Sequence, residues 1–164
     1  MKNKFWPVPS AERIVPRSKS RRGFGSNRKG GRFHSGTDIM AKYESNVIAI
    51  ESGIVKNIFT FTYPELDKYY KYEITYAIVI QHEDGNFALY GEVQKPSLKI
   101  GQKIREGQAI AKVGRIFSNK PHHTMLHFEY HSKLPKSTTK WYIGKRPKGL
   151  LSSTKYLTSV VDYS

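Results

Sequence analysis

The chain has 164 residues, a length typical of one domain with its own hydrophobic core. It contains 28 Lys and Arg against 13 Asp and Glu, and the formal net charge of +15 predicts binding to polyanions such as anionic wall or envelope polymers, anionic lipid or nucleic acid. Cysteine is absent, which excludes disulfides and thiolate metal ligands, so any metal must be held by His, Asp or Glu.

Residues 1–31 are expected to form a basic arm, rich in Gly, Ser and Pro, that packs on a β domain formed by residues 32–164. The basic run at residues 17–22 is either an exposed loop or a specific anion-binding arm. The first residues lack the ~7–15 apolar residues of a secretory signal, and no stretch approaches the ~20 apolar residues of a membrane span. We therefore expect a protein made in the cytoplasm. If its substrate lies outside, the protein must reach it after lysis, after injection or as part of a virion.

From residue 46 onward the sequence predicts β-strands, because runs rich in β-branched and aromatic residues alternate with turn residues. The predicted strands cover residues 47–50, 54–55, 58–59, 72–81 and 87–93. Asp84-Gly85, between the last two, is a strong signal for a β-hairpin. The Tyr-rich insertion at residues 63–72 is either an outer loop that shapes a groove or a long hairpin tip.

The second half of the chain continues the β pattern. Glycines divide residues 98–114 into short apolar runs, which predicts strands joined by tight turns, and apolar and polar residues alternate over residues 125–130. Residues 141–148 are expected to be a surface tail that packs one aromatic side chain on the sheet. Residues 152–154 can cap a short C-terminal helix that ends near Val161. Because the connections are too short for helical crossovers, we predict a mostly β fold with an antiparallel sheet.

Three side chains have the chemistry of zinc ligands. His34 and Asp38 are four residues apart with Gly36 between them, and His127 lies on the strand predicted at residues 125–130. Zn²⁺ accepts imidazole and carboxylate groups, and three protein ligands with an open position for water are the layout of a catalytic zinc site. The sequence therefore predicts a hydrolase with Zn²⁺ as its cofactor.

The order and spacing of five segments resemble the lysostaphin-type, or LytM-like, zinc metalloendopeptidases, which cut peptide bonds in bacterial cell-wall peptidoglycan. The segments are residues 33–38 (the first family motif), 47–55 (strand, turn and strand), 78–82 (the next strand), 100–114 (the glycine-punctuated segment) and 126–129, Leu-His-Phe-Glu (the end of the last motif). The resemblance covers roughly residues 24–130, which is most of the chain. It implies the fold of that family and a zinc ion held by His34, Asp38 and His127.

Two positions depart from the family pattern. Met125 stands where the family has a histidine two residues before the last ligand, and Glu92 stands where it has a histidine two residues after a Tyr. A Met side chain cannot transfer a proton. His123, or its neighbour His122, is therefore interpreted as the substitute for the histidine that is missing at position 125. Glu92 is interpreted as the general base, because a carboxylate next to a zinc-bound water can accept its proton.

Other polar residues have plainer alternatives. Glu129 shares a strand face with His127, where it either accepts a hydrogen bond that orients this ligand or is exposed to solvent. His131 lies on the same face and has no assigned role. His82 is expected to be a hydrogen-bonded residue at a strand end rather than a ligand, and Tyr90 to be a core residue.

We therefore expect a zinc endopeptidase, of the kind found in phage lysins, that acts on the peptide stems or cross-bridges of peptidoglycan. One alternative is an inactive, metal-bearing module that binds the cell wall or forms part of a virion. A second is a nucleic-acid-binding β domain. Against the second, the tyrosines cluster at residues 63–72 instead of alternating with Lys and Arg as base-stacking platforms, so no specific nucleic-acid partner is expected.

Overall fold

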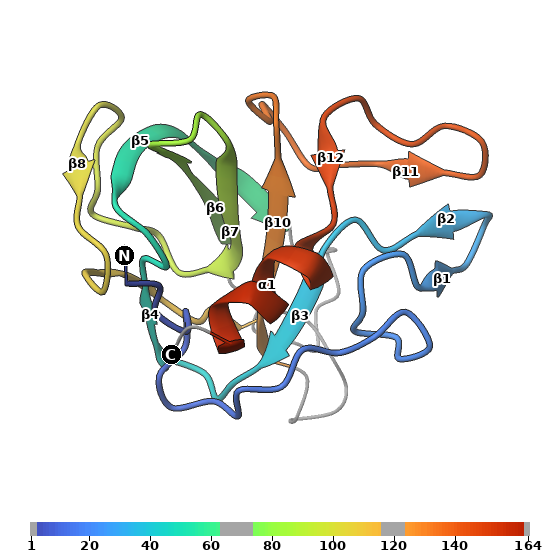
Figure 1. The fold of residues 1–164 in the computed structure, drawn as a ribbon, viewed down its shortest axis with the longest axis horizontal. Coiled ribbons are helices and arrows are strands. Elements are labelled where there is room, and N and C mark those ends of the chain that lie inside the picture. The colour runs from blue at the N-terminus through green and yellow to red at the C-terminus, as the bar shows by residue number, and fades with distance from the viewer. Residues whose placement is uncertain (1–2, 63–73, 116–123, 163–164) are drawn as a thin grey trace.

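The computed structural model describes residues 3–62, 74–115 and 124–162. Within these residues the chain forms twelve β-strands and one α-helix (Figure 1). Every strand pair among them is antiparallel. The predicted mostly β, antiparallel fold with a short C-terminal helix is confirmed. The Tyr-rich insertion, His122 and His123 lie outside the described residues.

The main sheet has seven strands. Its strand β10 (Met125–His131) connects β3 and β12 on one side with β7 and the remaining strands on the other. The other strands of this sheet are β12 (Leu150–Leu151), β7 (Phe87–Val93), β6 (Thr75–His82), β5 (Gly53–Thr62), β8 (Lys103–Ile104) and β3 (Thr37–Met40). One edge of β10 pairs with β7, and its other edge pairs first with β3 and then with β12. Segments far apart in the sequence therefore meet along β10.

Two smaller sheets flank the main one. β4 (Asn46–Ile48) pairs with β9 (Ala109–Lys112), and a three-stranded sheet contains β1 (Asn27–Arg28), β2 (Arg32–Phe33) and β11 (Trp141–Tyr142). The three-stranded sheet projects from the end of the molecule opposite β8 (Figure 1). The expected packing of residues 141–148 on the main sheet is wrong, because Trp141 pairs with β2 and contacts Phe24 and Phe33.

Local sequence signals place most other elements correctly. The hairpin between β6 and β7 turns at Gly85, whose φ of +90° suits glycine and whose N–H donates to the His82 carbonyl. The helix α1 (Ser153–Asp162) begins after Ser152, whose Oγ accepts a hydrogen bond from the Lys155 N–H at 3.1 Å. The two strands predicted at residues 54–55 and 58–59 are one strand, β5, which contains a bulge near Val55. In the described parts of the chain, no helix has both the length and the apolar character of a membrane span.

The main sheet has apolar residues on both faces. Ile78, Tyr90 and Phe128 belong to the larger core together with Leu157 of α1, the helix that lies across this face of the sheet (Figure 1). A smaller cluster on the other face contains Ala77, Val79 and Leu89, with Phe59, Phe61 and Phe87 packed against it. Because side chains alternate along a strand, the neighbours of Phe128 on β10 face this second side of the sheet. His127 and Glu129 therefore lie on the face opposite the larger core.

The N-terminal arm takes part in the larger core. Trp6 is 4% exposed and Val8 is fully buried, and both belong to that core. Ile48 of β4 also donates its N–H to the Pro7 carbonyl. These contacts attach the start of the chain to the domain.

If the arm is part of the folding unit, replacing Trp6 by Ala will lower the free energy of unfolding by about 3–5 kcal/mol, because it removes a buried aromatic side chain. Phe5→Ala, at a neighbouring aromatic that is 38% exposed, is the control and will cost much less. Urea denaturation followed by circular dichroism measures both changes. Equal, small effects would mean that the arm does not stabilise the domain.

Candidate metal centre

His34, Asp38 and His127 converge although 93 residues separate the two histidines. Asp38 on β3 lies directly opposite His127 on β10, and His34 immediately follows β2. Asp38 Oδ1 lies 2.9 Å from His127 Nδ1 and 3.2 Å from His34 Nε2, and these two nitrogen atoms are 3.2 Å apart. Three potential ligand atoms thus form a nearly equilateral triangle.

The outer ring nitrogens of the two histidines donate hydrogen bonds, which fix the nitrogen atoms that face the triangle. His34 Nδ1 lies 3.0 Å from the Gly23 carbonyl, which can only accept, so Nδ1 carries the proton and Nε2 presents a lone pair. His127 Nε2 lies 2.7 Å from Glu129 Oε2, so in the neutral imidazole Nε2 carries the proton and Nδ1 presents the lone pair. With both imidazoles neutral, the two inward-facing nitrogens and the Asp38 carboxylate are all acceptors.

Three converging acceptors repel one another unless a cation lies between them. Burial alone would lower the pKa of His127, but its hydrogen bonds with Asp38 and Glu129 raise that pKa to about 10. Burial likewise opposes ionisation of Asp38, yet its hydrogen bonds with His127 and His34 hold the pKa of its carboxyl well below the usual range. The triangle therefore attracts positive charge, either a proton or a metal ion.

The size of the triangle fits a zinc ion. Zn²⁺ binds His nitrogen and carboxylate oxygen at about 2.0–2.2 Å, which separates neighbouring ligands of a tetrahedral ion by about 3.3 Å. The observed separations of 2.9–3.2 Å are close to this value before any adjustment. All three residues are 7% exposed, so the ligands are shielded. These residues can hold Zn²⁺ and leave the fourth coordination position for water or substrate.

Glu129 organises the surroundings of His127. It is fully buried, and its Oε2 accepts hydrogen bonds from His127 Nε2 at 2.7 Å and Ser35 Oγ at 2.9 Å. Its Oε1 accepts from His131 Nε2 at 2.7 Å and Thr139 Oγ1 at 2.6 Å. Burial opposes ionisation, but the hydrogen bonds with the two histidines hold the pKa of Glu129 well below its usual range. Glu129 is thus a buried anion, and the solvent-exposed alternative is wrong.

The sequence did not assign roles to Ser35, His131 or Thr139. A signal existed for His131, because it lies two residues after Glu129 on the same strand face. No comparable signal marks Ser35 or Thr139. Their contacts with Glu129 span 94 and 10 residues and arise from the tertiary fold.

Gly36 is required where β10 approaches the segment between His34 and Asp38. A Cβ atom at this position would lie 2.4 Å from the Phe128 carbonyl oxygen and 2.8 Å from His127 Nε2. Both distances are shorter than van der Waals contact permits. The glycine of the first motif therefore has a steric cause.

A bulge in β7 turns Glu92 toward the metal centre. β7 has one more residue than β6 between the pairs Val93–Tyr76 and Tyr90–Ile78, and Glu92 has a φ of +63°, which non-glycine residues seldom adopt. In a regular strand, Glu92 would share the core-facing side of Tyr90. The bulge instead brings its side chain into the cavity that His34, Asp38 and His127 line.

Two hydroxyl groups hold the Glu92 carboxylate. Its Oε1 accepts from Thr62 Oγ1 at 2.5 Å and its Oε2 accepts from Thr75 Oγ1 at 2.8 Å. Burial raises the pKa of Glu92 above its usual value, even though these hydrogen bonds act in the opposite direction. The cavity thus contains two carboxyl groups whose pKa values are displaced in opposite directions.

The cavity over the metal centre has a volume of about 240 Å³. Its wall also contains Met125, Phe61 and Trp141, and the cationic residues Arg28 and Arg32. Arg28 Nη2 lies 3.6 Å from Asp38 Oδ2, the carboxylate oxygen that faces away from the histidines. The structure therefore brings Glu92, Met125 and the three predicted ligands to one cavity, whereas His123 lies outside the described residues.

His82 and Tyr90 lie away from this cavity, as expected. His82 Nδ1 is 3.1 Å from Glu51 Oε2 at the end of β6, on the core side of the sheet. Tyr90 is fully buried, and its hydroxyl oxygen accepts a hydrogen bond from the Ile50 N–H at 2.9 Å. The predictions of a hydrogen-bonded strand-end histidine and a core tyrosine are confirmed.

Residues 32–139 match the sequence model of one protein family, described as peptidase family M23. Similar solved structures include a zinc-containing peptidase from Vibrio cholerae, with 27% identity and a TM-score of 0.54 over 79% of this chain and 37% of the other. Lysostaphin from Staphylococcus simulans has 19% identity and a TM-score of 0.60 over 92% of this chain and 51% of the other. A chain of the SpoIIQ–SpoIIIAH pore-forming complex has 17% identity and a TM-score of 0.60 over 100% and 99%.

These similarities confirm the fold that the sequence motifs implied. The present chain spans 37% and 51% of the lengths of the Vibrio peptidase and of lysostaphin, so it corresponds to a part of each of them. At 17–19% identity, the likeness to lysostaphin and to the pore-forming complex establishes the fold alone.

If Glu129 holds His127 in the tautomer that binds metal, Glu129→Gln will weaken zinc binding about 10–100-fold, because an amide offers one acceptor atom in place of two. Competition with a chromophoric zinc chelator measures the affinity. Glu51→Gln is the matched control, since Glu51 also pairs with a buried histidine, but on the other face of the sheet. An unchanged zinc affinity in Glu129→Gln would contradict this role.

Proposed function

Because this chain belongs to peptidase family M23, we propose that it is a zinc-dependent endopeptidase that hydrolyses peptide bonds in the stems or cross-bridges of bacterial peptidoglycan. The observation that carries the proposal is the triangle of acceptor atoms of His34, Asp38 and His127, with sides of 2.9–3.2 Å. The hydrogen bonds to Gly23 and Glu129 further support it, because they prepare both histidines for a cation. A purely structural histidine pair would not need this arrangement.

His34, Asp38 and His127 would hold the zinc ion, which when bound polarises the scissile carbonyl and lowers the pKa of water to about 7. Glu92 then accepts the proton of the attacking water, because its carboxylate lines the same cavity and its raised pKa makes it a stronger base. Thr62 and Thr75 orient the Glu92 carboxylate through their hydroxyl groups. Arg28 keeps Asp38 Oδ1 directed at the histidines by attracting Oδ2.

Another residue than Met125 must donate the proton to the leaving amine, because Met125 lines the cavity but its side chain cannot transfer a proton. Glu92 can return the proton that it took from water, since a carboxylic acid next to the scissile bond is a competent general acid. His123 is the other candidate donor in this proposal. The substrate peptide would enter between the aromatic wall residues Phe61 and Trp141.

The presence of Met125 and Glu92 at the two positions where the family has histidines favours a second candidate, a metal-bearing wall-binding module without turnover. Both candidates use the same three ligands and the same cavity. They differ only in whether peptide bonds are broken, so a measurement of product release separates them.

The enzyme proposal predicts that the zinc-loaded protein releases new amino termini from purified cell walls and that a chelator stops this release. Added Zn²⁺ will restore it, because the ion binds its protein ligands reversibly. Labelling of free amino groups and mass spectrometry of the soluble fragments measure the reaction. A zinc-loaded, folded protein that releases no fragments from any wall type would favour the binding module.

Replacing Glu92 by Gln is expected to lower the turnover rate by about 10²–10⁴-fold, because the amide cannot accept a proton. Zinc content will stay unchanged, since Glu92 is not one of the three ligands. Glu44→Gln is the matched control: Glu44 has a comparable φ of +69° but is exposed and lies outside the cavity. Full activity in Glu92→Gln would place the base elsewhere.

A further inference from the structure

The excess of positive over negative charge in this protein is confined to two segments of its sequence. Residues 13–37 contain eight Lys and Arg, residues 130–161 contain seven, and neither segment contains Asp or Glu. The remainder of the chain has thirteen Lys and Arg and thirteen Asp and Glu, so it is electrically balanced. The whole net charge of +15 therefore comes from these two segments.

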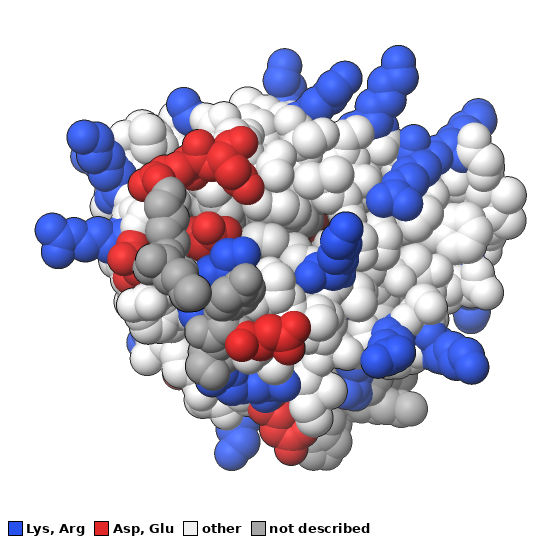
Figure 2. Space-filling model, in the orientation of Figure 1, with Lys and Arg blue, Asp and Glu red and all other residues white. Residues whose placement is uncertain are grey.

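The two segments meet in the folded protein. Phe33 of β2 pairs with Trp141 of β11, and the arm before β1 runs along α1. Figure 2 shows Lys and Arg, without Asp or Glu, over the half of the face that contains β1, β2 and β11, whereas the acidic residues gather over the other half. We call the surface formed by residues 13–37 and 130–161 the cationic surface.

The charges of the cationic surface are available to a partner. Fourteen of its fifteen Lys and Arg are exposed, and Arg28 is half-buried. Among the described residues, Asp38, which contacts Arg28, is the one carboxylate that forms an ion pair with this group. Such a concentration of like charge is self-repelling, and a polyanion that neutralises it binds with a gain in free energy.

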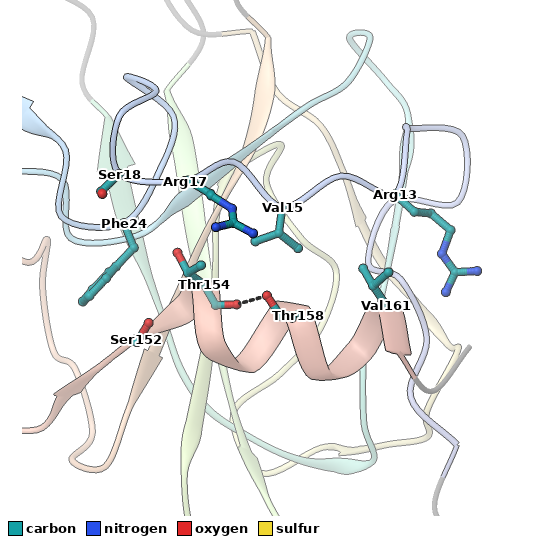
Figure 3. A pocket seen from close by; sticks show the side chains of 9 residues that line it. All are labelled: Arg13, Val15, Arg17, Ser18, Phe24, Ser152, Thr154, Thr158 and Val161. Atoms are coloured by element: carbon teal, nitrogen blue, oxygen red, sulfur yellow. Dashed lines mark hydrogen bonds between the residues drawn. The ribbon is translucent and has the colours of Figure 1, made fainter.

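A groove crosses the cationic surface between the arm and α1 (Figure 3). Its volume is about 500 Å³, and all of its lining residues belong to the two acid-free segments. Arg17 extends over the first turns of α1, and Arg13 lies near Val161 toward the other end of the helix. Ser152 and Thr154, which carry hydroxyl groups, line the groove near the start of α1. The groove thus offers separated cations and hydroxyl donors along one line.

The groove and the metal cavity share a wall. Phe24 lines the groove and Trp141 lines the cavity, and their rings are in contact with centroids 5.2 Å apart. Two further members of the cationic surface, Arg28 and Arg32, line the cavity itself. An extended anion on this surface would therefore reach the edge of the metal centre.

The aromatic residues of this region favour recognition of charge over recognition of bases. Phe24, Phe33 and Arg146 all pack against Trp141, at 5.1–5.2 Å from its ring. Binding of single-stranded nucleic acid relies on aromatic faces that are free to stack on bases. Of the aromatic residues of the cationic surface, Tyr142 alone is exposed, at 41%, so the surface offers one such face. A flexible phosphodiester chain without bases requires only cations and hydroxyl donors.

We propose that the cationic surface binds a linear phosphodiester polymer of the cell wall and thereby holds the metal cavity against the wall peptides. This inference rests on the proposed function, because that function determines which polymer the surface meets. The metal cavity and the cationic surface share Arg28, Arg32 and Trp141, but most of the lysines of this surface lie outside the cavity. Changes at exposed lysines outside the cavity should therefore alter wall binding and leave the chemistry intact.

The test compares two triple variants of the full chain that lose the same charge. Lys29, Lys140 and Lys145 of the cationic surface are replaced by Gln in one, and Lys95, Lys99 and Lys103 of the balanced part in the other; all six are exposed, and none lines the metal cavity. Binding to purified walls is measured by co-sedimentation at several salt concentrations. A chelator is present throughout so that no wall is digested.

The first variant is expected to bind polymer-bearing walls about tenfold more weakly than the wild type, with a shallower salt dependence, because fewer phosphates are neutralised. The second variant will bind like the wild type. Walls from which the polymer has been removed by acid will bind all three proteins weakly and equally. Cleavage of a soluble wall peptide by the zinc-loaded proteins will be equal, which separates surface binding from catalysis.

Three results would overturn the inference. They are equal losses in the two variants, undiminished binding to polymer-free walls, and displacement from walls by duplex DNA at a lower phosphate concentration than by the soluble polymer. Failure of all three proteins to cleave the soluble peptide would instead contradict the proposed function, and the binding results would stand independently.

Discussion

The antiparallel pairing of β3 with β10 is the constraint on which the metal centre depends. Its register sets Asp38 opposite His127 and brings β10 so close to the preceding segment that only glycine fits at position 36. Side chains alternate along a strand, so a slip of one residue would turn His127 into the larger core and Phe128 into the cavity. Burial of Phe128 in the core therefore fixes the register that the ligands require.

The pKa values of the buried carboxyl groups in the centre depend on whether a charged partner lies next to them. Asp38 and Glu129 are buried beside histidines and remain ionised, whereas Glu92 is buried beside two neutral hydroxyl groups and has a raised pKa. Carboxyl groups of the same kind thus acquire different protonation behaviour within one region. This separation is typical of sites in which one carboxylate binds a cation and another handles protons.

The distribution of charge connects this centre with the remainder of the molecule. The two acid-free segments surround one side of the cavity, and the balanced part of the chain supplies most of the sheet that supports it. Trp141 joins the two regions, because it lines the cavity while it packs against Phe24 of the basic arm. Positioning on an anionic wall and hydrolysis within it can therefore be served by adjacent surfaces of a small domain.

Features that depend on neighbouring residues could be predicted from the amino-acid sequence. They are the hairpin at Gly85, the return strand at residues 87–93, the helix after Ser152 and the three candidate ligands. Turn chemistry, strand alternation and capping are local, so a short stretch of sequence contains their whole cause. Two features required the folded structure: a bulge turns Glu92 into the cavity, and Glu129 accepts hydrogen bonds from four donors. These outcomes depend on which strands pair and in which register, and long-range packing of the core selects both.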